Sequence, residues 1–210
     1  MSDIAQPIGQ TDVAVDLKDT ASLLGSRICH DLISPLGAIS NGLELLAMSG
    51  LPDSPELNLI EESIESANAR VRFFRVAMGA ASGSQVLARS EVLKLLQGCY
   101  SGGRIQIHWH PAADPSRTDA KVAFLALLCL ESTLSQGGEI AISENRGRWT
   151  LQAYGQKIRF DNEVWTALDT GRPIVANSSQ VQFLLLQEAL ITLERTPQIG
   201  HSDTAVSLSY

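Results

Sequence analysis

The sequence has few cysteines, few basic residues and no long apolar run, and each shortage excludes a class of protein. The three cysteines (Cys29, Cys99 and Cys129) lie far apart in 210 residues and form no Cys-x-x-Cys pair, which favours a reducing compartment over a disulfide framework. Basic residues number 16 against 23 acidic ones, and the net charge of −7 makes nucleic acid a poor partner. No stretch reaches about 18 consecutive apolar residues, and the first 19 residues carry four aspartates and no signal-peptide core. We therefore expect a cytoplasmic protein that neither spans a membrane nor is exported.

What is present fits a soluble globular protein made of two small units. Hydrophobic residues make up 44% of the chain and charged residues 19%, which predicts a buried core. Residues 1–80 carry 11 acidic and 5 basic side chains, whereas residues 81–210 carry 12 and 11. This change coincides with the small-residue stretch at 79–84, which is typical of a linker. We predict a flexible tail over residues 1–19, a first domain over 20–80 and a second over 81–210.

The first domain has the pattern of two amphipathic helices. Between residues 20 and 48 the apolar positions recur at steps of three and four: Leu24, Ile28, Leu32, Pro35, Ile39, Leu43 and Leu46. After a break at 49–53, Ser54 is the expected N-cap of a second helix with Pro55 in its first turn. Its apolar positions form a regular heptad: Leu57, Ile60, Ile64, Ala67, Val71, Phe74 and Met78. One hairpin cannot cover both apolar stripes, so we predict a four-helix bundle formed by two chains.

The second domain has a mixed pattern that predicts helices layered on a mostly antiparallel sheet, so the chain as a whole is α+β. We expect helices at 90–100 (capped by Ser90), 118–135, 162–168 and 179–195. Strands are expected at 104–110, 139–143, 149–154, 157–160 and 205–209, and the turn into the second of them contains Gly137-Gly138.

One histidine of the first helix stands apart from the apolar stripe. At 100° per residue, His30 shares its own stripe with Arg27, Ser34, Gly37 and Asn41, which apart from the arginine are small or polar. An exposed imidazole with little bulk around it is suited to a docking partner that must reach Nε2. Pro35 lacks its N–H and is expected to bend the helix just after the histidine.

The run from His30 to Leu36 resembles the H-box of two-component histidine kinases, in which an acid follows the phospho-accepting histidine and Pro-Leu comes five and six residues on. A solvent-facing histidine on an ordinary helix remains the alternative. The second domain resembles, more weakly, the ATP-binding domain of those kinases, in the order of its elements, in Gly137-Gly138 and in the terminal helix–strand pair.

The residues that such kinases use for ATP are missing here. Ser132 stands near the position of the magnesium-binding asparagine. The Asp-x-Gly-x-Gly motif is replaced by Ala153-Tyr154-Gly155-Gln156-Lys157, and no Gly-x-Gly precedes the helix at 181–186. We expect this domain, which resembles a degenerate kinase ATPase domain, not to bind ATP.

A phospho-acceptor hairpin joined to a nucleotide-free kinase-like domain resembles the ChpT-type histidine phosphotransferases, and residues 26–46 carry the specific part of the resemblance. Membership implies a homodimer that takes a phosphoryl group from the receiver domain of a hybrid histidine kinase and passes it to the receiver domains of response regulators. In alphaproteobacteria such a relay controls the cell cycle. An atypical autophosphorylating kinase and a non-enzymatic dimeric scaffold for receiver domains remain the alternatives.

The resemblance also implies roles for individual residues. His30, neutral at physiological pH, would be the nucleophile, and Asp31 would hold the proton of the other ring nitrogen, unless it is only a surface acid. Arg27 would steer an acidic receiver, unless it is only solvated. Ser34, Leu36, Gly37 and Asn41 are expected partner contacts; Ser34 stands where phosphatases of this type carry Thr or Asn, which puts phosphatase activity in doubt. The receiver would supply the magnesium, so no cofactor or metal site of its own is expected.

Four other residues carry weaker signals. His108 and His110 share one strand face but have no evident third metal ligand, so we expect no metal there. Cys29 is expected to be a small packed thiol in preference to a redox group. His201 is expected in a loop.

Overall fold

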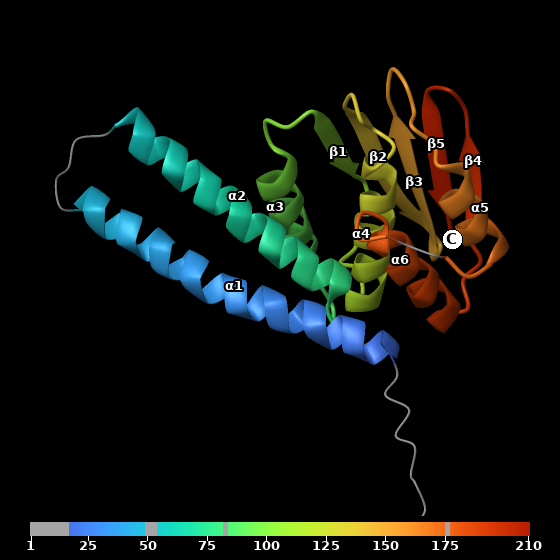
Figure 1. Cartoon of the computed structure of the whole chain (residues 1–210), viewed down its shortest axis with the longest axis horizontal. Helices are drawn as coiled ribbons and strands as arrows, with labels where there is room; N and C mark the ends of the chain where they lie inside the picture. The colour runs from blue at the N-terminus through green and yellow to red at the C-terminus, as the bar shows by residue number, and fades with distance from the viewer. Residues whose placement is uncertain (1–16, 49–53, 82–83, 175–176) are drawn as a thin grey trace, which may run out of the picture.

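The computed structural model describes residues 17–48, 54–81, 84–174 and 177–210. Its first two helices, α1 (Leu17–Met48) and α2 (Pro55–Met78), form the predicted antiparallel hairpin (Figure 1). Ser54 caps α2 by accepting a hydrogen bond from the backbone N–H of Leu57, and Pro55 opens the helix, as expected. Most of the predicted tail and the turn at 49–53 lie outside the described residues.

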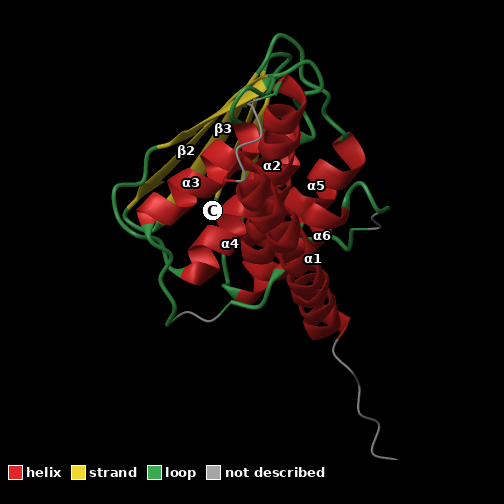
Figure 2. Ribbon diagram, turned by 90° about the vertical axis from the view of Figure 1, so that its left-hand side faces the viewer, coloured by secondary structure: helices red, strands yellow, loops and turns green. Residues whose placement is uncertain are grey.

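The rest of the chain forms a five-stranded sheet with helices on one face, which agrees with the predicted α+β class (Figure 2). The helices are α3 (Arg89–Tyr100), α4 (Arg117–Glu131), α5 (Asn162–Thr170) and α6 (Val181–Thr192). The strands are β1 (Ile105–Trp109), β2 (Gly138–Asn145), β3 (Arg148–Tyr154), β4 (Gln198–His201) and β5 (Ala205–Ser209), in the spatial order β1-β2-β3-β5-β4. Only the β1–β2 pair is parallel within this sheet.

Three sequence-based predictions for this part are wrong. Residues 157–160 are not a strand, because the backbone N–H groups of Ile158 and Arg159 donate to Asp203 and Thr133 and not to a neighbouring strand. Ser90 does not cap α3: Ala88 is the N-cap residue, and the Asp114 carboxylate accepts the N–H of Arg89. The strand β4 was not expected, and it places His201 in a strand and not in a loop.

The core lies between the sheet and α4, and α2 contributes to it. Nine residues of α4 are buried, among them Phe124, whose ring stacks on that of Phe73 of α2 at 4.4 Å and 5°. Val76 and Ala77 of α2 belong to the same buried cluster. The last turns of the hairpin are therefore packed into the core of the second domain, although the boundary predicted at residue 80 follows directly after them. No described helix is both long and apolar enough to cross a bilayer.

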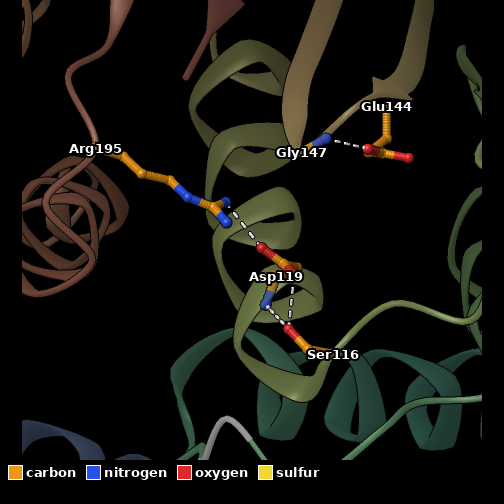
Figure 3. A network of polar contacts seen from close by, with 5 residues as sticks. All are labelled: Ser116, Asp119, Glu144, Gly147 and Arg195. Atoms are coloured by element: carbon orange, nitrogen blue, oxygen red, sulfur yellow. Dashed lines mark hydrogen bonds and ion pairs between the residues drawn. The ribbon is translucent and has the colours of Figure 1, made fainter.

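The start of α4 is fixed by a polar network (Figure 3). Ser116 caps the helix by accepting the N–H of Asp119, and its hydroxyl donates to the Asp119 carboxylate at 2.7 Å. That carboxylate also forms an ion pair of 2.8 Å with Arg195, which follows α6. The network therefore joins the start of α4, where Arg117 follows the cap, to Arg195 after α6.

Candidate functional site

His30 lies on α1 with an exposed side chain, and it lines a groove of about 940 Å³ at the junction of the two domains. Ile33 joins it from α1, and the other walls come from the last turns of α2, the segment at 85–87, α3 and the start of α4. The histidine predicted to carry the chemistry therefore faces a hollow that both domains build.

The groove is positively charged around the histidine. Arg72 and Arg75 reach it from the last turns of α2, and Arg117 reaches it from the first turn of α4, while Glu91 of α3 is the acidic residue among its lining side chains. Among the described lining side chains, three guanidinium groups against one carboxylate make the groove a favourable place for an anion.

Arg117 joins the two domains at this groove. Its Nη2 donates to the backbone carbonyl oxygen of Arg75 at 2.9 Å, and its backbone N–H donates to the carbonyl of Gln85 at 2.7 Å. Partial burial, and secondarily the like charge of Arg75, lowers the pKa of the Arg117 guanidinium below its ordinary value. An arginine retains its charge at neutral pH even so.

A second cation from α4 holds the end of α2. Lys121 Nζ donates to the carbonyl oxygen of Gly79 at 2.9 Å, and burial lowers the pKa of this ammonium group. The last carbonyls of a helix lack partners within the helix and carry its negative dipole end, so a cation stabilises them. Arg117 and Lys121 together hold residues 75–79 against α4 and so fix the part of the groove wall that α2 supplies.

Cys29, next to the histidine, is a packed thiol. It is 6% exposed, and burial raises its thiol pKa, opposed by the nearby charge of Arg75. A buried thiol of raised pKa is poorly reactive, which agrees with the expected structural role.

Of the other residues predicted along α1, the five whose side chains the structure describes do not line the groove. Ser34, Pro35 and Asn41 are exposed and Leu36 and Gly37 half-buried, farther along the helix from the junction. The side chains of Arg27 and Asp31 lie outside the described set. Pro35 stands inside the continuous helix α1, and the bend that we expected there stays a prediction.

The sequence analysis did not identify Arg72, Arg75 and Arg117 as residues of the site. Arg72 and Arg75 are three residues apart and so share one face of α2, a spacing that could have pointed to them. Arg117 carried no such signal, because it is separated by 42 residues from the carbonyl that it binds.

A row of large apolar side chains on the hairpin faces solvent in the single chain. Ile28, Leu32, Ile39 and Leu46 of α1 are 50%, 45%, 49% and 44% exposed, and Ile60 of α2 is 46% exposed. These residues belong to the two stripes expected to pack in a bundle. A contiguous apolar surface of this kind marks a site of protein–protein contact.

The three remaining histidines lie outside the groove. His108 and His110 share the exposed face of β1, with their rings 6.4 Å apart, and His108 Nε2 lies 3.4 Å from a Glu139 carboxylate oxygen. The ring of His201 stacks on Phe160 at 3.9 Å. In the part of the chain that the structure describes, no group of three or more His, Cys, Asp or Glu side chains is placed to hold a metal.

Comparison with known proteins defines the class. The model of the histidine phosphotransferase C-terminal domain matches residues 89–204, and the chain belongs to this family. Protein phosphotransferase ChpT of Brucella abortus (strain 2308) is 31% identical over 183 residues, which cover 83% of this chain and 87% of that protein.

One solved structure shows the same fold. A 1.7 Å structure of a bacterial phosphotransferase superposes with a TM-score of 0.64 at 22% identity, covering 98% of this chain and 99% of the other. The histidine kinase domain of the blue-light activated histidine kinase EL346 from Erythrobacter litoralis gives a TM-score of 0.42 at 13% identity, over 90% of this chain and 92% of that one. We draw no conclusion from a similarity as low as the second.

Proposed function

We propose that the protein is a phosphorelay intermediate that accepts a phosphoryl group on His30 from a receiver domain and passes it to the aspartate of a second receiver. The observation that supports this most is the place of His30, exposed on α1 in a groove lined by arginines from both domains. The sequence of the hairpin and the family to which the chain belongs point in the same direction.

The chemistry needs only a positioned imidazole on this side. Nε2 of neutral His30 attacks the phosphorus of the receiver's phosphoaspartate, the P–O bond to the carboxylate breaks, and the carboxylate leaves with the bonding electrons. The Nδ1 proton can then be held by an acceptor, a role that we propose for Asp31. The transition state is loose, and the magnesium ion and charged clamp come from the receiver, so this chain contributes mainly position. Onward transfer to a second receiver is the reverse of these steps.

We also propose that two chains form a four-helix bundle through the exposed apolar stripes of α1 and α2. Burial of about 25 cal/mol per Å² of apolar surface would stabilise such a dimer, and five members of the stripes stay 44–50% exposed in the single chain. Ser34, Leu36, Gly37 and Asn41, which lie beyond the groove on α1, would then contact the receiver, with Arg27 attracting its acidic rim. The upstream partner would be the receiver of a hybrid kinase, and the downstream partners would be cytoplasmic response regulators of the cell cycle.

We propose further that the second domain does not bind ATP. Ser132, at the position that resembles the magnesium-binding asparagine, donates its hydroxyl to the carbonyl of Cys129 in its own helix. At Gly155, in the degenerate adenine motif, an added Cβ would lie 2.8 Å from Cδ2 of Leu134. The backbone N–H of Arg159 donates to the carbonyl oxygen of Thr133. The segment after β3 therefore packs directly on the end of α4, where the resemblance would require a nucleotide cleft.

The test is transfer from a receiver domain that has been phosphorylated and freed of ATP. The wild-type protein should become labelled in an acid-labile, alkali-stable form, and His30→Gln should remain unlabelled. His108→Gln is the matched control, because it removes an exposed histidine outside the groove and should be labelled like the wild type. Labelling of His30→Gln at the wild-type rate would refute the assignment, and self-labelling with ATP and magnesium alone would favour an autokinase.

A further inference from the structure

The groove beside His30 holds more positive charge than the attack by a neutral imidazole requires. Of the charged side chains that the structure describes along it, three are arginines (Arg72, Arg75 and Arg117) and one is a carboxylate, that of Glu91. Docking of an acidic partner could use such charge anywhere on the surface, but these arginines are gathered in the same hollow as the histidine.

Two of the arginines are held close to each other against their mutual repulsion. The Nη2 of Arg117 is bound to the main chain of Arg75 at 2.9 Å, and the charge of Arg75 is near enough to lower the pKa of the Arg117 guanidinium. Because Arg117 is partly removed from water, a like charge nearby costs free energy that an anion would offset. The Glu91 carboxylate also acts on Arg117, in the opposite sense to Arg75 and as the smallest of the three causes. Since one hydrogen bond fixes the Arg117 fork, its other N–H donors remain for a ligand.

A phosphoryl group on Nε2 of His30 would be such an anion. It carries close to two negative charges at neutral pH and three acceptor oxygens, and the histidine that would carry it opens into this groove. Hydrogen bonds between guanidinium and phosphoryl oxygens are charge-assisted and about twice as strong as neutral ones.

We propose that Arg75 and Arg117 form a phosphoryl-binding subsite that stabilises the phosphorylated form of His30, with Arg72 adding charge at the rim. This inference rests on the proposed function, because it presumes that His30 is the acceptor. It gives the second domain a role in the transfer itself, since Arg117 belongs to α4.

The test uses phosphoramidate, a small phosphoryl donor that has no docking surface. Nε2 of His30 forms a bond to phosphorus as the donor's P–N bond breaks, ammonia leaves, and the Nδ1 proton passes to the buffer. We expect phosphoramidate to label Arg117→Gln about tenfold more slowly than the wild type, because one charge-assisted contact with the phosphoryl group is lost. The labelling rate of Arg75→Gln should fall by a smaller factor. Arg159→Gln, which removes an exposed arginine outside the groove, should label at the wild-type rate.

Because Arg117 also fastens α2, its variant is checked by circular dichroism, and Arg75→Gln, whose side chain is exposed, decides the matter if Arg117→Gln does not fold. If phosphoramidate labels the wild type and the folded arginine variants at the same rate, the subsite is refuted. This holds even if transfer from a receiver is slower in the variants, because the arginines would then act only in docking the receiver. With a receiver that exchanges with the wild type, the arginine variants should also shift the equilibrium toward the aspartyl phosphate, which a residue that only docks the partner cannot do. Failure of both phosphoramidate and receivers to label wild-type His30 would refute the proposed function and this inference with it.

Discussion

The Nη2 of Arg117, in the first turn of α4, lies 2.9 Å from the backbone carbonyl oxygen of Arg75, near the end of α2. This hydrogen bond joins the hairpin that carries His30 to the domain that contains the sheet. Lys121 makes a parallel contact one turn along α4, with the carbonyl of Gly79. The part of the groove wall that α2 supplies therefore depends on these two hydrogen bonds between α2 and α4.

Removal of the Lys121 contact should destabilise the junction. Lys121→Met keeps the length of the side chain but leaves the Gly79 carbonyl without this donor, and we expect the free energy of unfolding to fall by about 1–2 kcal/mol. Urea unfolding followed by circular dichroism measures the change. Lys94→Met, an exposed lysine on α3, serves as control and should leave the midpoint unchanged. Equal midpoints for the two variants would show that the contact adds nothing to stability.

The hairpin and the second domain should unfold together. Phe73 of α2 is 2% exposed and stacks on Phe124 of α4, so Phe73→Ala opens a cavity in the shared core and should cost about 3–5 kcal/mol. Ile191→Ala, which removes a side chain 60% exposed, should cost far less. Scanning calorimetry checks both variants. Two separate transitions in the wild type, with only one moved by Phe73→Ala, would contradict a shared core.

The sequence predicted the helical hairpin well because its signals are local. The three–four spacing of apolar residues and the Ser54-Pro55 start each act within one or two turns, and the structure has both. The strand β4 could not be predicted from Gln198-Ile199-Gly200-His201, since the register that pairs Ile199 with Leu208 is set by the hairpin with β5. Apolar Ile158 and Phe160 alternate with polar residues as in a strand. The backbone N–H of Arg159 nevertheless donates to the carbonyl oxygen of Thr133, just after α4, and not to a neighbouring strand.

The candidate site was predictable only in part for the same reason. His30 is identified by residues within two turns of it. The groove depends on tertiary contacts between residues far apart in the chain, such as Arg75 and Arg117, and no spacing in the sequence shows them.

A charge in the apolar stripe of α1 should separate the proposed dimer. Ile39 is 49% exposed in the single chain, and Ile39→Asp would place a carboxylate in the bundle interface, where an unpaired charge is costly. We expect light scattering to report a dimer for the wild type and a monomer near 22.6 kDa for the variant. Ile191→Asp makes the same change on an exposed site of α6 and should stay dimeric. A wild-type monomer at micromolar concentration would exclude the bundle.

Stability should fall as the pH rises above 9.0. Burial raises the pKa of the Cys99 thiol from 9.0 to about 11, and those of Cys129 and Tyr210 lie well above their ordinary values for the same reason. Between pH 9.0 and about 11 the unfolded chain releases protons that the folded chain retains, so alkali favours unfolding. Urea unfolding across this window measures the slope, which Cys99→Ala should reduce. A free energy of unfolding that stays constant through the window would contradict the raised pKa of the buried thiols.

The most direct test of the account is a reconstituted relay of two receiver domains with this protein between them. Label that starts on the first receiver should reach the second only when the protein is present, and it should pass through an acid-labile adduct that peptide mapping locates at His30. His30→Gln should stop the flow, and His108→Gln should not. Transfer between the receivers that continues undiminished with His30→Gln would contradict the central claim and would leave the protein as a scaffold.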